Sequence, residues 1–408
     1  MNDLSRAIAT RVLARIHTGQ LTLIEGEDTA IYGSGAPQAT VHIRDPRAWP
    51  KLLKGGRGMA EAYMDGPWDT PDLTAVIRVA ARNVGQLDEL RHRLTPVREP
   101  FQRARAAFGR NTPRRSRRHI AAHYDLGNEL FELMLDPTLM YSCAVFPDRD
   151  ATLEDAQQHK LELVCEKLEL GPRDHVLEIG TGWGGFAVYA ASTRGCKVTT
   201  TTISKEQHDV AARRVEEAGV GHLVDLRLDD YRDLRGSYDK LVSLEMIEAV
   251  GWQHFGTFFE RCSELLAPNG TMLLQAITID DRAYAVEKAS KSFIRTYIFP
   301  GGCLPSQEVI AKQIARRTDL RAVHLDDLTA HYPETLRRWR ANFDAAADHL
   351  HHLGYDERFR RLWRLYLSYS EAGFAERRIG LVQTVFAKPL AQLEGLAAPA
   401  AATSAAAG

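Results

Sequence analysis

The sequence lacks the features that mark secreted, membrane-spanning and polyanion-binding proteins. No apolar run approaches the roughly 18 to 20 residues needed to cross a bilayer, and the first residues do not begin the apolar core of a signal peptide. The 52 Lys and Arg residues nearly cancel the 53 Asp and Glu residues, so the net charge of −1 gives no reason to expect a nucleic-acid partner. We therefore expect a cytoplasmic protein.

Cysteine is scarce, and its spacing shows no pairing. The five cysteines are odd in number and form no CxxC pair, which argues against a disulfide framework or a zinc site. His119 and His123 are four residues apart, as two ligands on one helix face would be, but no third ligand or HExxH glutamate accompanies them. We expect no metal.

A glycine-rich stretch stands at the centre of the sequence. Residues 176–186 are a short apolar run that ends in four glycines and opens into a helical pattern. The spacing fits both GxGxxG and GxGxG, so the loop alone does not separate a dinucleotide site from a nucleoside site. Dinucleotide sites usually have an acidic residue at the end of the second strand, about 20 positions on. Here that strand ends in Thr202-Ile203-Ser204, which disfavours a nicotinamide cofactor.

Strand and helix patterns alternate around this loop. A capping box at Thr152–Asp155 opens a helix that runs to Leu170. The predicted strands are 175–179, 197–203, 224–228, 240–244, 271–277, 321–326 and 381–387, and predicted helices among them are 186–193, 205–217 and 254–266. The alternation predicts an α/β fold with a doubly wound, mostly parallel sheet. Ligands bind at the carboxyl ends of such strands, where we expect Glu178, Ser204, Asp229, Asp230, Glu245 and Glu248 to collect.

The remaining segments suggest a domain division. Residues 1–100 are predicted to form a small α+β domain with a helix at 4–16, strands at 21–25 and 40–44, and a helix at 73–82. Residues 101–118 carry seven arginines and form either a solvated linker or a patch for an anionic membrane surface. Residues 119–390 make the catalytic domain, whose aromatic-rich helices mostly pack its core, and the Ala-rich residues 391–408 a disordered tail.

Several segments taken together resemble the cyclopropane-fatty-acyl-phospholipid synthase family. They are His123–Asn128 (HYDLGN), Tyr141–Cys143, Gly180–Gly185 with Trp183, Thr202–Ser204 with Gln207, Asp230–Asp233, Ile247–Gly251 and Tyr297–Pro305. The resemblance covers nearly the whole chain. It implies a class I S-adenosylmethionine-dependent methyltransferase with a seven-stranded sheet, an N-terminal domain that helps to present the lipid, and a helical insertion that binds the acyl chain. It also implies peripheral contact with the inner face of the membrane and a possible homodimer.

The resemblance further implies a reaction and a set of site residues. Family members transfer a methyl group to a cis double bond of a phospholipid acyl chain, and a bound bicarbonate removes a proton as the cyclopropane ring closes. The bicarbonate ligands fall on Cys143 (through its backbone amide), Glu248, Gln275, Ile277 and Tyr332. The S-adenosylmethionine site falls on Tyr141, Ser142, Glu178, Gly180, Thr181, Gly182, Trp183, Gly184, Gly185, Thr202, Ile203, Ser204, Gln207, Asp230, Tyr231 and Arg232.

Three residues depart from the family pattern. Gln275 stands where the family has His, Glu245 stands at a position that is often Gly, and Ala249 replaces a His. Gln donates a hydrogen bond to an anion but carries no charge and shuttles no proton. Glu245 either caps or pairs with an arginine away from the chemistry, or it lies close enough to Glu248 to create a protein base.

These departures leave alternative functions open. The same methyl transfer can end in a methylene- or methyl-branched chain instead of a ring. A small-molecule methyltransferase of the same fold, or a lipid- or nucleoside-binding protein whose catalysis has lapsed, are further possibilities.

Overall fold

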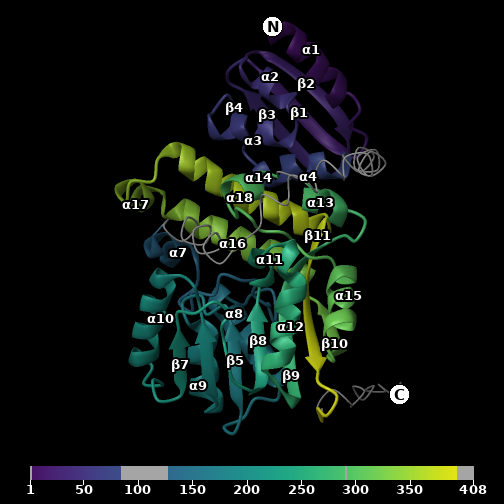
Figure 1. The fold of residues 1–408 in the computed structure, drawn as a ribbon. Coiled ribbons are helices and arrows are strands. Elements are labelled where there is room, and N and C mark those ends of the chain that lie inside the picture. Colours follow the sequence, from purple (N-terminus) through teal and green to yellow (C-terminus); the bar gives the residue numbers. More distant parts are fainter. Residues whose placement is uncertain (1, 84–126, 290–291, 393–408) are drawn as a thin grey trace, which may run out of the picture.

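The computed structural model describes residues 2–83, 127–289 and 292–392, which form two β-sheets with a layer of helices between them (Figure 1). The predicted basic linker, His119 and His123, and residues 393–408 of the predicted tail lie outside the described residues. The proposed domain boundaries therefore stay predictions.

The larger sheet has seven strands in the order β10-β11-β9-β8-β5-β6-β7. All neighbouring pairs are parallel except those of β11, which is antiparallel to both β9 and β10. The strands are β5 His175–Ile179, β6 Lys197–Thr201, β7 Val224–Arg227, β8 Tyr238–Leu244, β9 Leu266–Ile279, β10 Arg321–Asp327 and β11 Ile379–Ala387. The chain builds β5, β6 and β7 outward and then returns to place β8 beside β5, so ligands are expected at the carboxyl ends of β5 and β8.

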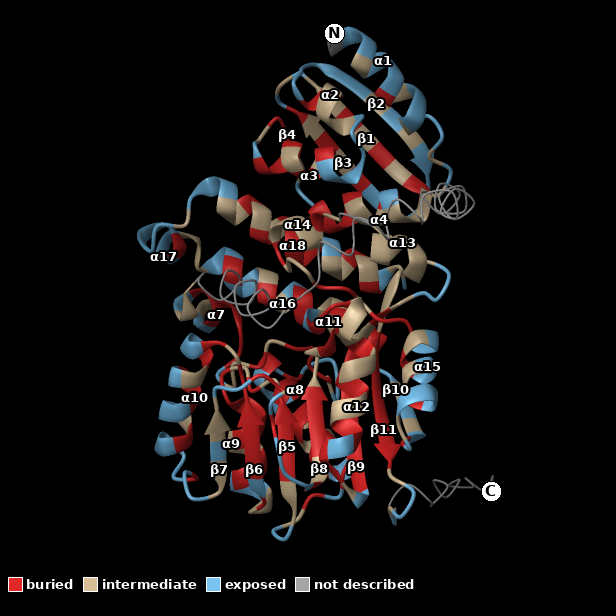
Figure 2. Ribbon diagram, in the orientation of Figure 1, coloured by how far each residue is buried: buried red, intermediate tan, exposed pale blue. Residues whose placement is uncertain are grey.

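The predicted doubly wound, mostly parallel sheet is confirmed, and each predicted strand occurs with small differences at its ends. The central strands are buried and helices cover both of their faces (Figure 2), which explains why the buried part of β5, residues 176–179, is apolar apart from Glu178. The covering helices are α8 Leu153–Lys167, α9 Gly185–Arg194, α10 Lys205–Glu217, α12 Phe255–Leu265 and α15 Gln307–Arg317. The predicted capping box of Thr152 and Asp155 is present at the start of α8.

The smaller sheet lies in the N-terminal part and has the order β2-β1-β3-β4. Its strands are β1 Gly19–Glu25, β2 Asp28–Ser34, β3 Gln38–Ile43 and β4 Trp68–Asp69, and the helices beside it are α1 Asn2–Leu13, α2 Ala48–Leu52, α3 Gly56–Met64 and α4 Leu73–Asn83. The sequence patterns predicted β1, β3, α1 and α4 but not β2. That strand is a mostly exposed edge with little apolar alternation, so its pairing with β1 has a weak sequence signal.

A helical layer joins the two sheets. It contains α7 Asn128–Met134, α11 Ile247–Val250, α13 Tyr284–Ala289, α14 Phe293–Tyr297, α16 Tyr332–Ala345, α17 Ala347–His352 and α18 Glu357–Ala375, with short 3₁₀ turns at Trp252–His254 and Thr329–His331. From α18, the buried Arg361 donates hydrogen bonds to the carbonyl oxygens of Tyr63 (2.6 Å) and Trp68 (2.9 Å). One apolar core therefore continues from the N-terminal sheet into the aromatic side chains of α16 and α18.

No helix within residues 2–83, 127–289 and 292–392 combines the length and the apolar character that a bilayer span requires.

Candidate active site

One large cavity runs from the glycine-rich loop to the N-terminal sheet. Its volume is about 1850 Å³, whereas pockets for one small ligand usually have roughly 300 to 1,000 Å³. We call the part lined by Gly180–Trp183, Thr201–Ile203 and Asp229–Arg232 the glycine-loop end, and the part lined by Glu245, Glu248, Ile277 and Tyr332 the carboxylate end. The cavity therefore has room for two different ligands.

The glycine loop follows β5 directly. Gly180, Gly182 and Gly184 have φ values of +105°, +52° and +87°, which residues with a Cβ rarely adopt. A Cβ on Gly182 would meet no protein atom within 4 Å and would project into open space, so the loop presents bare backbone to a ligand. The predicted site residues Gly184 and Gly185 do not line the cavity. A Cβ on Gly185 would lie 2.6 Å from Met140 Sδ, so that glycine permits close packing.

Glu178 and Ser142 anchor the wall beside the loop. Glu178 is buried, accepts a hydrogen bond from Thr200 Oγ1 (2.6 Å), and has its pKa raised to about 8 by burial. Ser142 Oγ accepts a hydrogen bond from Nζ of Lys160 (2.7 Å), a fully buried lysine whose pKa is lowered to about 8 by burial. Lys160 was not predicted, because a single lysine in an amphipathic helix normally lies on the solvated face.

The loops after β6 and β7 complete the glycine-loop end. Thr202 Oγ1 and Gln207 Oε1 are 2.8 Å apart and both residues line the cavity. Ser204, a predicted site residue, lies outside the lining and caps α10 by accepting a hydrogen bond from the Gln207 amide. The carboxylate of Asp230 forms a two-point ion pair with Arg232, at 2.7 and 2.6 Å.

Two aromatic residues of the glycine-loop end are fixed by packing. The Tyr231 ring, predicted to lie beside an adenine, lines the cavity but also packs edge-on against Phe258 in the core. Trp183 donates a hydrogen bond from Nε1 to Oδ1 of Asn128 (2.9 Å), the last residue of the HYDLGN segment. That contact explains part of the motif, because it sets the orientation of a loop residue that lines the cavity.

At the carboxylate end, Glu245 accepts hydrogen bonds from three groups. The backbone amide of Cys143 (2.9 Å) and Nε2 of Gln275 (2.6 Å) donate to Oε1, and the Tyr332 hydroxyl donates to Oε2 (2.5 Å). The interpretation that Glu245 caps or pairs with an arginine away from the site is therefore wrong. Cys143 and Gln275 are fully buried and do not line the cavity, so both reach its wall only through Glu245.

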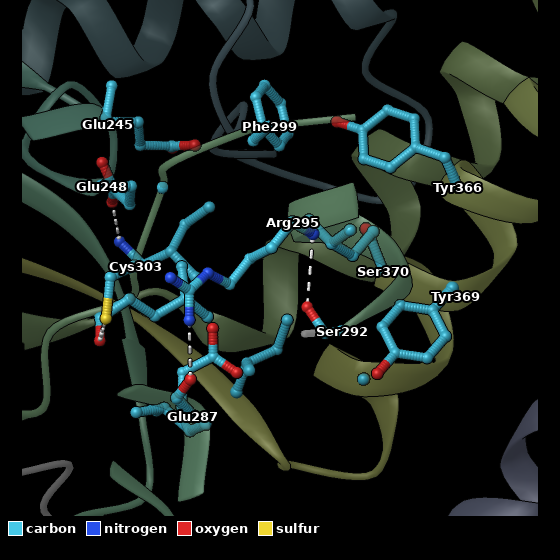
Figure 3. A pocket seen from close by; sticks show the side chains of 18 of the residues that line it. Glu245, Glu248, Glu287, Ser292, Arg295, Phe299, Cys303, Tyr366, Tyr369 and Ser370 are labelled. Atoms are coloured by element: carbon cyan, nitrogen blue, oxygen red, sulfur yellow. Dashed lines mark hydrogen bonds between the residues drawn. The ribbon is translucent and has the colours of Figure 1, made fainter. Parts of the chain in front are cut away.

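Glu248 lies beside Glu245 on the wall of the cavity (Figure 3). Its Oε1 accepts a hydrogen bond from the Ile277 amide (2.6 Å), and its buried Oε2 has no hydrogen-bond partner. Burial and the neighbouring charge of Glu245 raise the pKa of Glu248 to about 8. The five residues predicted by resemblance to hold a small anion are thus brought together, with Glu245 added among them.

A chain of buried polar side chains supports Gln275 from behind. Its Oε1 accepts a hydrogen bond from Nε2 of Gln383 (2.8 Å), whose Oε1 accepts one from Nζ of Lys167 (2.5 Å). Lys167 also pairs with Asp326. Gln275 and Gln383 are directly opposite each other in the antiparallel pairing of β9 with β11. The sequence does not reveal this pairing, because the two residues are more than 100 positions apart.

Beyond the carboxylates the cavity becomes mostly apolar. Its lining there includes Phe293, Ile294, Phe299, Leu336, Leu365, Phe374, and from the N-terminal part Met59, Trp68, Leu73 and Ile77. Phe299 belongs to the Tyr297–Pro305 motif, whose Cys303 amide donates to the Glu248 carbonyl oxygen (2.9 Å). Phe299 and Tyr366 lie across from the carboxylates in Figure 3. The N-terminal part, where the sequence showed nothing catalytic, contributes to the same cavity.

The strand order, the glycine loop after the first strand and the cavity at the carboxyl ends of β5 and β8 define a class I S-adenosylmethionine-dependent methyltransferase. The residues fit this cofactor, because bare backbone at Gly182 admits close approach and the Glu178 carboxyl, which a cationic ligand would ionise, lines the same part of the cavity. A profile of the family described as "Mycolic acid cyclopropane synthetase" matches residues 111–384. The chain belongs to this family.

Similar proteins extend the match over most of the chain. Tuberculostearic acid methyltransferase UfaA1 of Mycobacterium tuberculosis is 40% identical over 93% of this chain and 90% of its own length. Cyclopropane-fatty-acyl-phospholipid synthase of Escherichia coli is 38% identical over 87% of this chain and 89% of its own. The structure of the mycolic acid cyclopropane synthase CmaA1 with SAH and CTAB has a TM-score of 0.63 at 30% identity, covering 67% of this chain and 98% of that chain. The chain is therefore a lipid-modifying S-adenosylmethionine-dependent methyltransferase.

Proposed function

We propose that this enzyme adds one carbon from S-adenosylmethionine to the cis double bond of an unsaturated acyl chain in a phospholipid, and that the product is a cyclopropane fatty acid. The observation that carries the proposal is the shape of the cavity. A glycine-loop end suited to the cofactor opens into an apolar passage, and two buried carboxylates stand where the two meet. A soluble polar acceptor would not require such a passage.

The passage suits an acyl chain because apolar side chains form much of its lining. Phe299, Leu336, Leu365 and Phe374 are mostly buried side chains that line it, and it continues to Ile77 in the N-terminal part. The stacked rings of Tyr332 and Phe374, with centroids 4.0 Å apart, form an apolar wall next to the carboxylates. Exclusion of water matters, since water would trap a carbocation.

The chemistry needs one bond-forming step and one deprotonation. Bound S-adenosylmethionine supplies an electrophilic methyl carbon. The alkene forms a bond to that carbon as its bond to sulfur breaks, and a cation is left on the neighbouring alkene carbon. Loss of a proton from the added methyl group lets the C–H electron pair close the ring. Glu248 lines the cavity, and its buried Oε2, which has no hydrogen-bond partner, is the atom that we propose accepts that proton.

A second product is favoured by two specific observations. Gln275 and Glu245 depart from the family pattern at the carboxylate end, and one relative is named a tuberculostearic acid methyltransferase. If a hydride first shifts from the methyl-bearing carbon to its cationic neighbour, loss of the same methyl proton gives an exocyclic methylene group instead of a ring. A methyl branch would then need a separate hydride donor and a proton.

The membrane and oligomeric predictions accompany this proposal. An enzyme whose substrate is a phospholipid must meet a bilayer surface. We propose that this enzyme is cytoplasmic and associates with the inner face of the membrane, and that it forms a homodimer. The arginines between 103 and 118 were the sequence basis for membrane contact, and they lie outside the described residues. Sedimentation with vesicles that contain anionic lipid, and molar mass in solution, test the two predictions separately.

The function is tested by lipid analysis. The full chain, expressed in a host that lacks such enzymes, should incorporate label from methyl-labelled S-adenosylmethionine into phospholipid. Mass spectrometry should show acyl chains heavier by one CH₂ unit. Both products have this mass, but a cyclopropane does not react with ozone and an exocyclic methylene does. Label found only in soluble molecules would contradict the proposal.

A further inference from the structure

We infer that Glu245 is a built-in anion of the active site, which occupies the position that a bicarbonate ion would need and makes the reaction independent of added bicarbonate. The inference rests on the proposed acyl-chain methylation and concerns how its cation is stabilised and deprotonated. Three donors from separate parts of the chain converge on one carboxylate: the Cys143 amide, the Gln275 side chain and the Tyr332 hydroxyl.

The donors predicted by resemblance to hold bicarbonate are all engaged by the protein. Cys143, Gln275 and Tyr332 donate to Glu245, and the fourth donor, the Ile277 amide, donates to Glu248. The remaining predicted ligand, Glu248, is itself a carboxylate. A bicarbonate ion would thus meet two buried carboxylates and none of these donors free, so the site does not fit that ion.

The backbone of Glu245 has a conformation that residues with a Cβ disfavour, so the surrounding structure must hold it in place. Its φ of +54° lies in the left-handed region, which glycine adopts readily and residues with a Cβ rarely do. Glu245 follows β8 directly, and its amide donates to the Gln275 carbonyl oxygen (2.8 Å), so both ends of the residue are tied to β9. Strained positions of this kind concentrate at functional sites, where the surrounding structure fixes them.

The three donors that converge on the Glu245 carboxylate favour its ionised form, although burial is the larger effect and leaves the pKa of Glu245 above its ordinary value. Burial raises its pKa, while the hydrogen bonds from Tyr332, Cys143 and Gln275 and the positive charge of the buried Lys160 lower it. Gln383 and Lys167 hold the Gln275 amide with its NH₂ group toward Glu245. The consequence is a division of roles: Glu245 keeps a fixed negative charge near the developing cation, and the unpartnered Oε2 of Glu248 accepts the proton.

The deciding variant is Glu245→Gly, because glycine accepts the left-handed backbone and leaves a carboxylate-sized space among the same donors. Labelled-methyl transfer to phospholipid is measured in carbon-dioxide-depleted buffer, with and without bicarbonate or formate. We expect the wild-type rate to be unchanged by either anion. We expect Glu245→Gly to lose about 100-fold or more without anion and to recover at least about tenfold with it, in line with the effect of removing one preorganised electrostatic group.

A binding measurement gives a second readout that needs no turnover. NMR titration with ¹³C-formate should show binding to Glu245→Gly and none to the wild type or to Glu245→Gln, in which the amide still fills the space. Glu169→Gly is the matched control, since Glu169 also has a left-handed φ of +53°, is exposed and lies outside the cavity. This control should neither bind formate nor lose activity.

Two results would overturn the inference. One is a wild-type rate that falls tenfold or more when bicarbonate is removed, and the other is a Glu245→Gln variant as active as the wild type. Failure of the proposed function has a different signature, because the wild type would then label no phospholipid under any condition, while the formate titration would still report whether Glu245 fills an anion site.

Discussion

The two ends of the cavity are built by different means. At the glycine-loop end the ligand surface is largely backbone, set by positive-φ glycines immediately after β5. At the carboxylate end it is made of groups from the turn after β8, from α11, from β9 and from α16, which are joined by hydrogen bonds. The first end thus depends on local sequence, and the second depends on strand register and long-range contacts.

The difference indicates where functional divergence is possible. Replacing a residue of the loop changes the backbone path, so the glycine-loop end tolerates little variation. A side chain at the carboxylate end can be exchanged if its partners still find donors and acceptors. Glu245 and Gln275, which the resemblance marks as departures from the family pattern, are hydrogen-bond partners, so an exchange at one position affects the other.

The largest expected effect is the loss of turnover in Glu248→Gln. This variant should impair the carboxylate end of the cavity and leave cofactor binding at the glycine-loop end intact. The substitution keeps the shape and removes the proton acceptor, so we expect turnover to fall about 10²- to 10⁴-fold. Affinity for S-adenosylhomocysteine, measured by calorimetry, should change by less than about twofold, which corresponds to a change of roughly 0.4 kcal/mol or less in the binding free energy.

The matched control for this variant is Glu166→Gln, an exposed residue of α8 outside the cavity, which should leave turnover unchanged. A Glu248→Gln enzyme that turns over normally but binds cofactor poorly would reverse the assignment of the two ends.

The pH dependence should come from the carboxylate end. The pKa of Glu248 is raised to about 8 by burial first and by Glu245 second. Because the ionised form accepts the proton, the rate should rise with pH by about tenfold per unit below the midpoint and level off above it. The positive charge of bound cofactor favours the ionised form, so the midpoint in the loaded enzyme should lie at or below about 8.

Saturating cofactor separates this titration from that of Glu178, whose pKa is also raised to about 8 and which lines the cavity beside the glycine loop. Initial rates from about pH 5 to about pH 9 measure the profile. A flat profile over that range would contradict the raised pKa of Glu248 as the source of the pH dependence.

Gly182→Ala tests the glycine-loop end alone. The added methyl group meets no protein atom and projects into the cavity, so it should obstruct the cofactor and weaken S-adenosylhomocysteine binding by about tenfold, or 1.4 kcal/mol. Gly219→Ala is the matched control, since Gly219 also has a positive φ of +70° with nothing within 4 Å of the added Cβ and lies outside this cavity. Both variants should lose similar stability in urea, but only Gly182→Ala should lose affinity.

The same contrast separates what the sequence predicts from what it does not. The strands around β5, the capping box of α8 and the glycine loop are predicted correctly because their signals are local in sequence. Gly184, Gly185 and Ser204 share the motif with the cavity residues but serve packing and capping, a distinction that only the three-dimensional path reveals.

At the carboxylate end, the residues were predicted through resemblance and their arrangement was not. The sequence places Glu245 three positions before Glu248, but a left-handed backbone turns its side chain toward Cys143, Gln275 and Tyr332. Lys160 and Gln383 have no sequence signal, because an isolated polar residue in a helix or strand normally faces solvent. Their burial follows from which elements happen to pack against them.

The smallest effect is expected from Gln383→Met, which probes how far support for the carboxylate end extends. Methionine has a similar volume but no donor for Oε1 of Gln275, so a buried carbonyl oxygen is left unsatisfied at a cost of about 1 to 3 kcal/mol. The Gln275 amide then loses its fixed orientation, and we expect turnover to fall by roughly three- to tenfold. This loss is at or below the lower limit of the roughly 10- to 100-fold losses that are typical of residues supporting a functional group.

Thr271→Val, on the same sheet, is the control, because it removes a buried hydroxyl that has no hydrogen-bond partner. This variant should change neither stability in urea nor turnover. If Gln383→Met lowers stability and leaves turnover intact, Gln383 only stabilises the fold; if turnover falls and cofactor affinity does not, the polar chain from Lys167 positions the donors of Glu245.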